Sequence, residues 1–287
     1  MSFEIGDVIG DRFEILEELG AGNHGVVFRA MDRETRTEVA VKCLHPEMAT
    51  SRGVRLRMER EARAMGALAG TSAVKVIAFN EGPGGALYLA MELLHGKDLD
   101  TYLREIEAAS QRLSAAELFT LLDPIIDTLE AAHGIGIVHR DLKPANIFVL
   151  DEGGPSAVRL LDFGLAKDLK GEAVTRDGAI AGSPSYIAPE GWAGRPHDVD
   201  HRIDVYALGV VIFRALAGKV PFPSKKMYDL IFAVTRGPRP SLHALRPDLP
   251  TDVDRWVEKA LASNREERFQ NVRSLWSTLG IVLDRRP

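Results

Sequence analysis

Only one cysteine, Cys43, is present in this chain. A lone cysteine excludes an internal disulfide framework and a cysteine-based zinc site, and it suits a reducing cytoplasm. Long apolar runs are also missing: the longest, from Tyr206 to Ala217, contains Arg214 and falls short of the roughly 20 residues that cross a bilayer. Residues 1–16 have an acidic start and no continuous apolar core, which argues against a secretory signal. We therefore expect a cytoplasmic chain without a membrane partner.

Basic residues do not outnumber acidic ones: 36 Lys and Arg stand against 41 Asp and Glu, a formal net charge of −5. This balance does not predict the broad positive surface of nucleic-acid-binding proteins, so we expect no nucleic-acid partner. Apolar residues at 45% and charged residues at 27% are typical of a globular protein. A length of 287 residues suits one large domain or two small ones, since domains mostly contain roughly 100–200 residues.

The first third of the chain has the pattern of an antiparallel sheet, with short β-branched or alternating runs between turn residues. These runs are Phe13–Leu19, Val26–Met31, Glu38–Leu44, Val74–Phe79 and Leu87–Leu93. One segment differs: Arg52–Leu68 places its apolar residues three or four apart, which predicts a helix. We therefore expect a small sheet that carries one helix.

Beyond about residue 95 the apolar patterns have the period of helices. The predicted helices are Ser114–His133, His201–Ala217, Met227–Val234, Asp252–Leu261 and Val272–Leu283, and the predicted strands between them are Ile147–Leu150 and Val158–Leu161. Ser114 and Glu117 form a capping box at the start of the first helix. Because strand-rich and helix-rich segments are separated along the chain, we expect an α+β protein of two lobes. Residues 162–189 show no clear periodicity, and a loop of that length is usually functional or disordered.

The first segment with chemical character is a glycine-rich turn between two strands, with Gly20, Gly22 and Gly25. Glycines there allow a tight turn and a close approach of the backbone to a polyphosphate, although a plain glycine-rich hairpin is an alternative. Lys42 follows within an apolar strand, where an ammonium group needs an anionic partner unless it reaches solvent at an edge. Glu59 and Glu61 of the predicted helix are the available carboxylates.

Two further segments, His139–Asn146 (HRDLKPAN) and Asp162-Phe163-Gly164, contain the groups that phosphoryl transfer requires. A carboxylate can orient the attacking hydroxyl and accept its proton, and a cation can neutralise the transferring group. Oxygen ligands from Asn and Asp suit Mg²⁺. Any one of these aspartates alone could be an ordinary turn residue, but the whole set at this spacing is unlike a chance match.

Together these motifs resemble those of eukaryotic-type serine/threonine protein kinases, including bacterial members, over about residues 13–283. The resemblance implies a small antiparallel β lobe with one helix and a larger, mainly α-helical lobe. It places the nucleotide lobe at residues 1–92, a hinge at 93–97 and the catalytic and substrate lobe at 98–287. It also implies transfer of the γ-phosphoryl group of ATP to Ser or Thr of protein substrates, with Mg²⁺ or alternatively Mn²⁺.

The resemblance assigns roles residue by residue. Asp141 would be the catalytic base, Lys143 would neutralise the γ-phosphate, and Lys42 paired with Glu61 would hold the α- and β-phosphates. Asn146 and Asp162 would bind the metal ion. The residues implied to bind ATP are Leu19, Gly20, Gly22, Gly25, Val27, Ala40, Lys42, Met91, Glu92, Leu94 and Phe148.

Supporting and regulatory positions are implied in the same way. Glu190 of Ala188-Pro189-Glu190 would pair with Arg268, and Asp204 would hold the catalytic loop. Ser183, in a segment resembling G-T-x-x-Y, would touch Asp141 and Lys143. Arg140 is typical of kinases whose loop is ordered by phosphorylation. The candidate acceptor is Thr175, with Ser183 or Ser185 next. Asp177 could supply permanent negative charge there, or it could be a solvated loop residue.

Two other functions compete with this interpretation. A pseudokinase scaffold would bind nucleotide without turnover, but no lysine, base or metal position is missing here. A small-molecule phosphotransferase of related fold would lack the Ala188-Pro189-Glu190 segment. The resemblance also allows a homodimer that phosphorylates itself.

Overall fold

The computed structural model of the protein describes residues 3–22, 25–44, 52–82, 85–152, 154, 157–163, 184–193 and 199–284. For residues 52, 54, 57, 60, 61 and 193 it describes the backbone alone. The chain divides into two compact units, Met1–His95 and Gly96–Pro287. Each unit is described by itself below.

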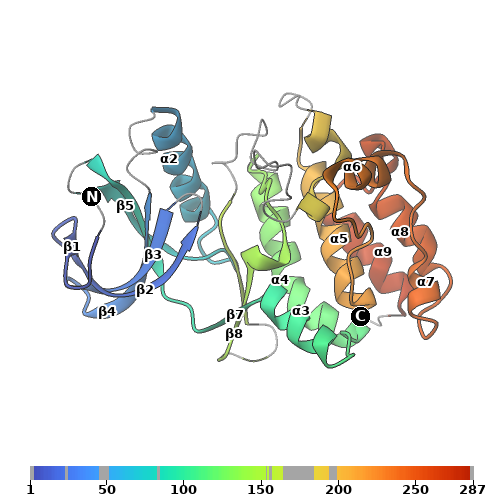
Figure 1. The fold of residues 1–287 in the computed structure, drawn as a ribbon, viewed down its shortest axis with the longest axis horizontal. Coiled ribbons are helices and arrows are strands. Elements are labelled where there is room, and N and C mark those ends of the chain that lie inside the picture. The colour runs from blue at the N-terminus through green and yellow to red at the C-terminus, as the bar shows by residue number, and fades with distance from the viewer. Residues whose placement is uncertain are drawn as a thin grey trace. The chain divides into compact units, whose positions relative to one another are not determined.

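The first unit is an antiparallel sheet in the order β1-β2-β3-β4-β6-β5, which carries the helix α2 (Figure 1). Its elements are β1 (Val8–Ile9), β2 (Phe13–Gly22), β3 (Gly25–Asp32), β4 (Thr37–Leu44), α2 (Arg52–Ala67), β5 (Val76–Glu81) and β6 (Leu87–Glu92). The five predicted strands and the predicted helix are all present. The largest differences in bounds are in β2, which continues three residues beyond the predicted end at Leu19, and in β5, which begins and ends two residues later than predicted.

The strand register gives this sheet two different faces. Side chains alternate between the faces of a strand, and paired residues on neighbouring strands share a face. One face forms a closed apolar core of Ile9, Phe13, Ile15, Phe28, Ala30, Val39, Val41, Cys43, Tyr88 and Ala90. Lys42 lies between Val41 and Cys43 in β4, so its side chain points to the opposite face.

The second unit is mainly helical (Figure 1). Its helices are α3 (Leu99–Ala108), α4 (Ala115–Gly134), α5 (Arg202–Ala217), α6 (Met227–Arg236), α7 (Leu242–Leu245), α8 (Val253–Ala260) and α9 (Val272–Val282). Ser114 and Glu117 form the predicted capping box at the start of α4. Nearly all of α5 is buried, including Asp204 and Arg214. This helix is therefore surrounded by the others, and its charged residues must be paired within the protein.

A small sheet of β7 (Gly96–Asp98), β8 (Ile147–Leu150) and β9 (Val158–Leu160) also belongs to this unit. Short 3₁₀ turns are η2 (Pro144–Asn146), η3 (Pro184–Tyr186), η4 (Pro189–Ala193) and η6 (Arg265–Glu267). The sequence patterns did not predict β7 or α3. Only Leu99 and Leu103 of α3 are buried, so its apolar stripe is too narrow for a clear periodicity.

The antiparallel sheet with one helix and the separate helical unit confirm the predicted α+β class. Within the ranges that the structure describes, no helix combines the length and apolar character needed to cross a membrane.

Candidate active site

Gly25 is required by the backbone of the first unit. Its φ is +155°, and a Cβ there would lie 1.9 Å from the carbonyl oxygen of Cys43 in the next strand. At Gly20 and Gly22, in contrast, an added Cβ would meet no atom within 4 Å. Close packing therefore explains the glycine at position 25, while the other two positions have open space beside them.

Four of the residues expected at the nucleotide share one face of the sheet. Val27 of β3 is paired with Lys42 of β4, and Ala40, two residues before Lys42, is paired with Met91 of β6. Paired residues and residues two apart in a strand project to the same side. The side chains of Val27, Ala40, Lys42 and Met91 therefore face away from the closed apolar core.

The other expected nucleotide residues of this unit lie at its margins. The side chain of Leu19 is 48% exposed at an irregular step between β2 and β3. The amide of Glu92 donates to the carbonyl oxygen of Lys75 at 2.9 Å, and its carboxylate accepts from the amide of Lys75 at 2.8 Å. Leu94 follows β6 and is half-buried. These hydrogen bonds fix the end of β6 before the segment that the sequence suggested as a hinge.

The helix α2 contains both carboxylates considered as partners for Lys42. Glu59 lies 3.5 Å from Arg55 and 3.8 Å from Arg63 on the same helix, so arginines already surround it. The side chain of Glu61 lies outside the described residues, and its pairing with Lys42 stays a prediction.

The second unit brings Asp141, Lys143 and Asn146 together in one short loop. Lys143 Nζ donates to Asp141 Oδ2 at 2.9 Å, and Asn146 Nδ2 donates to the same oxygen at 3.1 Å. Asn146 Nδ2 also donates to the backbone oxygen of Asp141 at 2.8 Å. The turn η2, with Pro144 at its start, lies between residues 143 and 146, whose side chains meet at the same carboxylate oxygen. Asp141 is thus a fixed carboxylate next to a cation.

Two backbone hydrogen-bonding groups define the protonation of the buried His139. Its Nε2 lies 3.0 Å from the carbonyl oxygen of Leu161, which can only accept, so Nε2 carries the proton. Its Nδ1 accepts from the amide of Asp141 at 3.3 Å. Burial lowers the pKa of His139, although nearby carboxylates such as Asp204 oppose the shift. A neutral histidine with this tautomer therefore connects the loop of Asp141 to the residue after β9, Leu161.

Asp204 of α5 holds the same loop through hydrogen bonds to its backbone amides. It is 1% exposed, and its two oxygens accept from the amides of His139 at 2.8 Å and Arg140 at 2.9 Å. His133 Nε2 lies 2.8 Å from the carboxylate. Burial raises the pKa of Asp204, but hydrogen bonds from His133 and the His139 amide outweigh this effect and lower it overall. The ionised carboxylate secures the loop while Arg140 adopts φ +65°, a strained conformation for a side-chain-bearing residue.

Asp162 follows β9 with φ +39°, and the next residue, Phe163, is fully buried against the ring of His139. Phe148 lies in the middle of β8, paired with Asp98 and Arg159. Gly164 and the regulatory candidates Thr175, Asp177 and Ser183 lie outside the described residues. Arg140 is exposed.

The donor set of this loop fits a magnesium ion. Asn146 uses its amide nitrogen on Asp141, so its amide oxygen points to another side, and Asp162 supplies a carboxylate. In the part of the chain that the structure describes, no group of three or more His, Cys, Asp or Glu residues could enclose a metal by itself. An amide oxygen with one carboxylate, completed by phosphate and water, is a typical environment for Mg²⁺.

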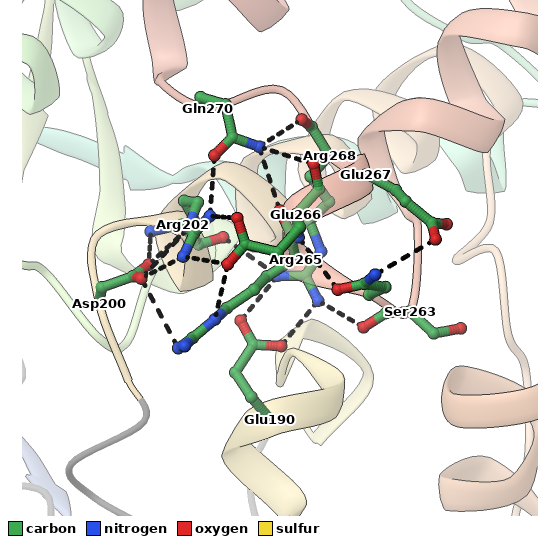
Figure 2. A network of polar contacts seen from close by, with 10 residues as sticks. Glu190, Asp200, Arg202, Ser263, Arg265, Glu266, Glu267, Arg268 and Gln270 are labelled. Atoms are coloured by element: carbon green, nitrogen blue, oxygen red, sulfur yellow. Dashed lines mark hydrogen bonds and ion pairs between the residues drawn. The ribbon is translucent and has the colours of Figure 1, made fainter.

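Glu190 and Arg268 form a buried ion pair that fixes the turn η4 (Figure 2). Arg268 Nη1 and Nη2 donate to the two carboxylate oxygens, both at 2.7 Å. The same guanidinium donates to the backbone oxygens of Ala262, Ser263 and Arg202. Every N–H group of Arg268 thus has an acceptor, and the pair connects the segment after residue 184 to α5 and to the turn before α9.

Some polar residues around this ion pair were not foreseen from the sequence. Arg202 Nη1 and Nη2 donate to Glu266, and the same side chain binds Asp200 and Gln270 around the buried pair (Figure 2). Burial raises the pKa of Asp200, but the hydrogen bonds of Arg202 lower it to about 2 overall. Arg214, in contrast, did carry a signal: it is the one charge that interrupts the longest apolar run.

Comparisons with known proteins agree on one family. The model of the protein kinase domain family matches residues 13–275. A probable serine/threonine-protein kinase of Corynebacterium efficiens is 33% identical over 284 residues, covering 96% of this chain and 42% of the relative. The serine/threonine-protein kinase PknA of Mycobacterium tuberculosis is 33% identical over 275 residues, covering 94% of this chain and 61% of the relative. The chain thus spans less than two thirds of the length of these relatives.

Solved structures give the same result. The kinase domain of PknI from Mycobacterium tuberculosis superposes with a TM-score of 0.75 at 27% identity, covering 98% of this chain and 99% of that one. A doubly substituted form of the same domain gives a TM-score of 0.77 at 26% identity, covering 99% and 100%.

Proposed function

Because the chain belongs to the protein kinase domain family, we propose that it transfers the γ-phosphoryl group of ATP to serine or threonine hydroxyls of protein substrates. The observation that carries this proposal is the contact of Asp141 with Lys143 and Asn146 in one loop. The kinases that this chain matches are longer proteins, of which it covers 42% and 61%, so their substrates and signals are not carried over to this chain.

The loop can perform the chemistry with its own side chains. Asp141 accepts a hydrogen bond from the attacking hydroxyl, orients it, and takes up its proton as the new O–P bond forms. Lys143, held at 2.9 Å from Asp141, places a positive charge where the transferring group gains negative charge. The hydrogen bonds to Asp204 keep this arrangement in place before the substrate arrives.

Residues of the first unit hold the nucleotide in this proposal. Val27, Ala40 and Met91 offer an apolar surface for adenine on the face that also carries Lys42. The open space beside Gly20 and Gly22 allows phosphates to approach the backbone. Leu19, Glu92, Leu94 and Phe148 are the remaining residues expected to bind the nucleotide. Glu61 is proposed as the ion-pair partner of Lys42.

A divalent cation bound by Asn146 and Asp162 would neutralise the phosphates during transfer. The family uses ATP with a divalent metal, and the hard oxygen donors favour Mg²⁺ as the specific ion, with Mn²⁺ as the alternative. We also propose a regulatory phosphate on Thr175, with Arg140 as one of its ligands, and a permanent negative charge supplied by Asp177. Ser183 would contact Asp141 and Lys143. Self-phosphorylation in a homodimer and a cytoplasmic location complete the proposal.

The test is transfer of radiolabelled phosphate from ATP to myelin basic protein, followed by analysis of the labelled amino acids. We expect label on serine or threonine with the wild type, and none with a Lys42→Met variant. Labelled tyrosine alone would contradict the substrate class. ATP binding without any transfer would support the pseudokinase alternative, and transfer to an aminoglycoside but to no protein would support the small-molecule alternative.

A further inference from the structure

The helix α6 turns two aromatic side chains toward solvent. Tyr228 is 78% exposed and Phe232 is 53% exposed, and they lie four residues apart. Residues three or four apart share one face of a helix, so the two rings are neighbours. The buried residues of α6, Leu230 and Val234, lie on the opposite face. The protein core therefore uses one side of α6 and leaves an aromatic stripe on the other.

Basic side chains flank this stripe. Residues 219–239 contain five basic residues and one acidic residue, Asp229, so the segment is positive in a chain whose net charge is −5. Lys225 and Lys226 are exposed just before the helix, and the exposed Arg236 continues the stripe one turn beyond the second ring. Within the ranges that the structure describes, none of these three side chains pairs with a carboxylate. Their charges are therefore available to an anion from outside the chain.

A face that combines positive charge with projecting aromatic rings fits an anionic lipid bilayer. Negative headgroups attract lysine and arginine, which raises the affinity roughly 5-fold for each residue near the membrane surface. Aromatic rings bury their apolar surface at the level of the headgroups. Peptides, in contrast, are usually bound in a groove or at the edge of a sheet. Because Tyr228 and Phe232 stand out from a helix, their exposure favours a lipid surface over a peptide segment.

We propose that the exposed face of α6, formed by Tyr228, Phe232 and Arg236 with Lys225 and Lys226 before the helix, binds the surface of an anionic lipid bilayer. The contact is peripheral and needs no spanning helix. It goes against the expectation of a chain without a membrane partner, because that expectation rested on the lack of a long apolar run and of a secretory signal. The inference does not depend on the proposed kinase function, since none of these residues belongs to the catalytic loop or to the nucleotide face.

Flotation with lipid vesicles tests this contact. The wild type should bind phosphatidylcholine vesicles that contain about 30% phosphatidylserine at least about 10-fold more tightly than vesicles of phosphatidylcholine alone, because only the former present negative headgroups. The affinity should fall as the salt concentration rises from about 0.1 M to about 1 M, since the Debye length then shortens from about 10 Å to about 3 Å.

Four variants separate the contribution of charge from that of the rings. Lys226→Gln should weaken binding to the anionic vesicles roughly 5-fold, and the double variant with Lys225→Gln roughly 25-fold. Tyr228→Ser and Phe232→Ser should each weaken it roughly 5-fold, because each removes a ring whose exposed surface would be buried among the lipids.

Two exposed residues elsewhere in the second unit provide matched controls. Arg255 of α8 is a basic residue whose side chain is 85% exposed, and Ile281 of α9 is an apolar residue that is 79% exposed. Arg255→Gln and Ile281→Ser should both bind the anionic vesicles within about 2-fold of the wild type, because neither residue lies on the face of α6. Circular dichroism of all variants should match that of the wild type.

Equal binding of the wild type to both kinds of vesicle, or binding to neither, would overturn the inference. Losses in the two controls as large as those in Lys226→Gln and Phe232→Ser would overturn it too. Poly-glutamate tests the competing partner: if it binds the wild type and loses affinity for the α6 variants while vesicles do not bind, the face belongs to an acidic protein and the membrane contact is wrong. If a ring variant does not fold, Lys226→Gln decides. Loss of phosphate transfer would contradict the proposed function and leave this result unchanged.

Discussion

Replacing Arg268 with methionine should destabilise the second unit strongly. The side chain of Arg268 is fully buried, and its guanidinium donates five hydrogen bonds: two to Glu190 and one each to Ala262, Ser263 and Arg202. It also lies over the ring of Tyr206, 5.1 Å from the centroid. Methionine fills a similar length but leaves the carboxylate of Glu190, 12% exposed, without its cation.

The magnitude follows from the burial of the pair. Removing one partner of a buried ion pair costs about 3–5 kcal/mol, because the remaining charge stays desolvated. The matched control is Arg255→Met, which breaks the pair of Arg255 with Asp252 at 3.5 Å, where the side chains are 85% and 67% exposed. An exposed pair of this kind contributes about 0–1 kcal/mol. The two variants thus remove the same residue type from opposite environments.

Urea unfolding followed by tryptophan fluorescence measures this difference. All three tryptophans of the chain, Trp192, Trp256 and Trp276, belong to the second unit, so the signal reports on the unit that contains Arg268. We expect the free energy of unfolding to fall by about 3–5 kcal/mol in Arg268→Met and by less than about 1 kcal/mol in Arg255→Met. Equal losses in the two variants would refute the assignment of a buried, fully bonded ion pair.

Three further predictions concern single sites. Ser114→Ala removes the capping box of α4 and should cost about 1 kcal/mol of unfolding free energy in the same urea assay, whereas no loss would contradict the cap. Burial raises the pKa of the Cys43 thiol to about 12, so the native protein at about pH 8 should not react with a thiol reagent, and one thiol per chain should react in urea. Rapid labelling of the native protein would contradict the burial of Cys43. Because the folded state keeps a proton that the unfolded thiol loses, Cys43 makes the free energy of unfolding fall as pH rises above about 8.5. Asp204→Asn replaces one of the two accepting oxygens by an NH₂ group, which then faces the amide N–H of either His139 or Arg140. Phosphate transfer should therefore fall at least about 10-fold in a radiolabel assay, and full activity would contradict the role of Asp204 in holding the loop.

The periodic parts of the fold were predictable from the sequence. Strands of the first unit and the long helices of the second have apolar patterns that local geometry dictates, and the Ser114 cap is encoded within four residues. The helix α3 was missed because it is mostly exposed and buries only Leu99 and Leu103. Two features of the sequence could have indicated this helix. Asp98 is its N-cap and accepts from the amide of Thr101, and Asp100 pairs with Arg104 one turn later.

The candidate site also has one part that the sequence predicted and one part that it did not. The catalytic loop is a short segment whose residues are close in sequence, so its motif indicated Asp141, Lys143 and Asn146 directly. The contacts of Arg202 with Glu266 and of Arg214 with Glu107 join residues 64 and 107 positions apart. Such pairs depend on how helices pack, and local patterns do not encode them. Tertiary contacts therefore define how the loop and the segment after residue 184 are supported.

The proposed function depends above all on Asp141 acting as the base in phosphate transfer to a protein hydroxyl. The most direct measurement compares wild type with Asp141→Asn, determining kcat for myelin basic protein and the dissociation constant for ATP in each. Asparagine keeps the size of the side chain but cannot accept the proton, so kcat should fall roughly 10²–10⁴-fold while ATP binding stays unchanged. Equal kcat values in the two proteins would contradict the role of Asp141 as the base.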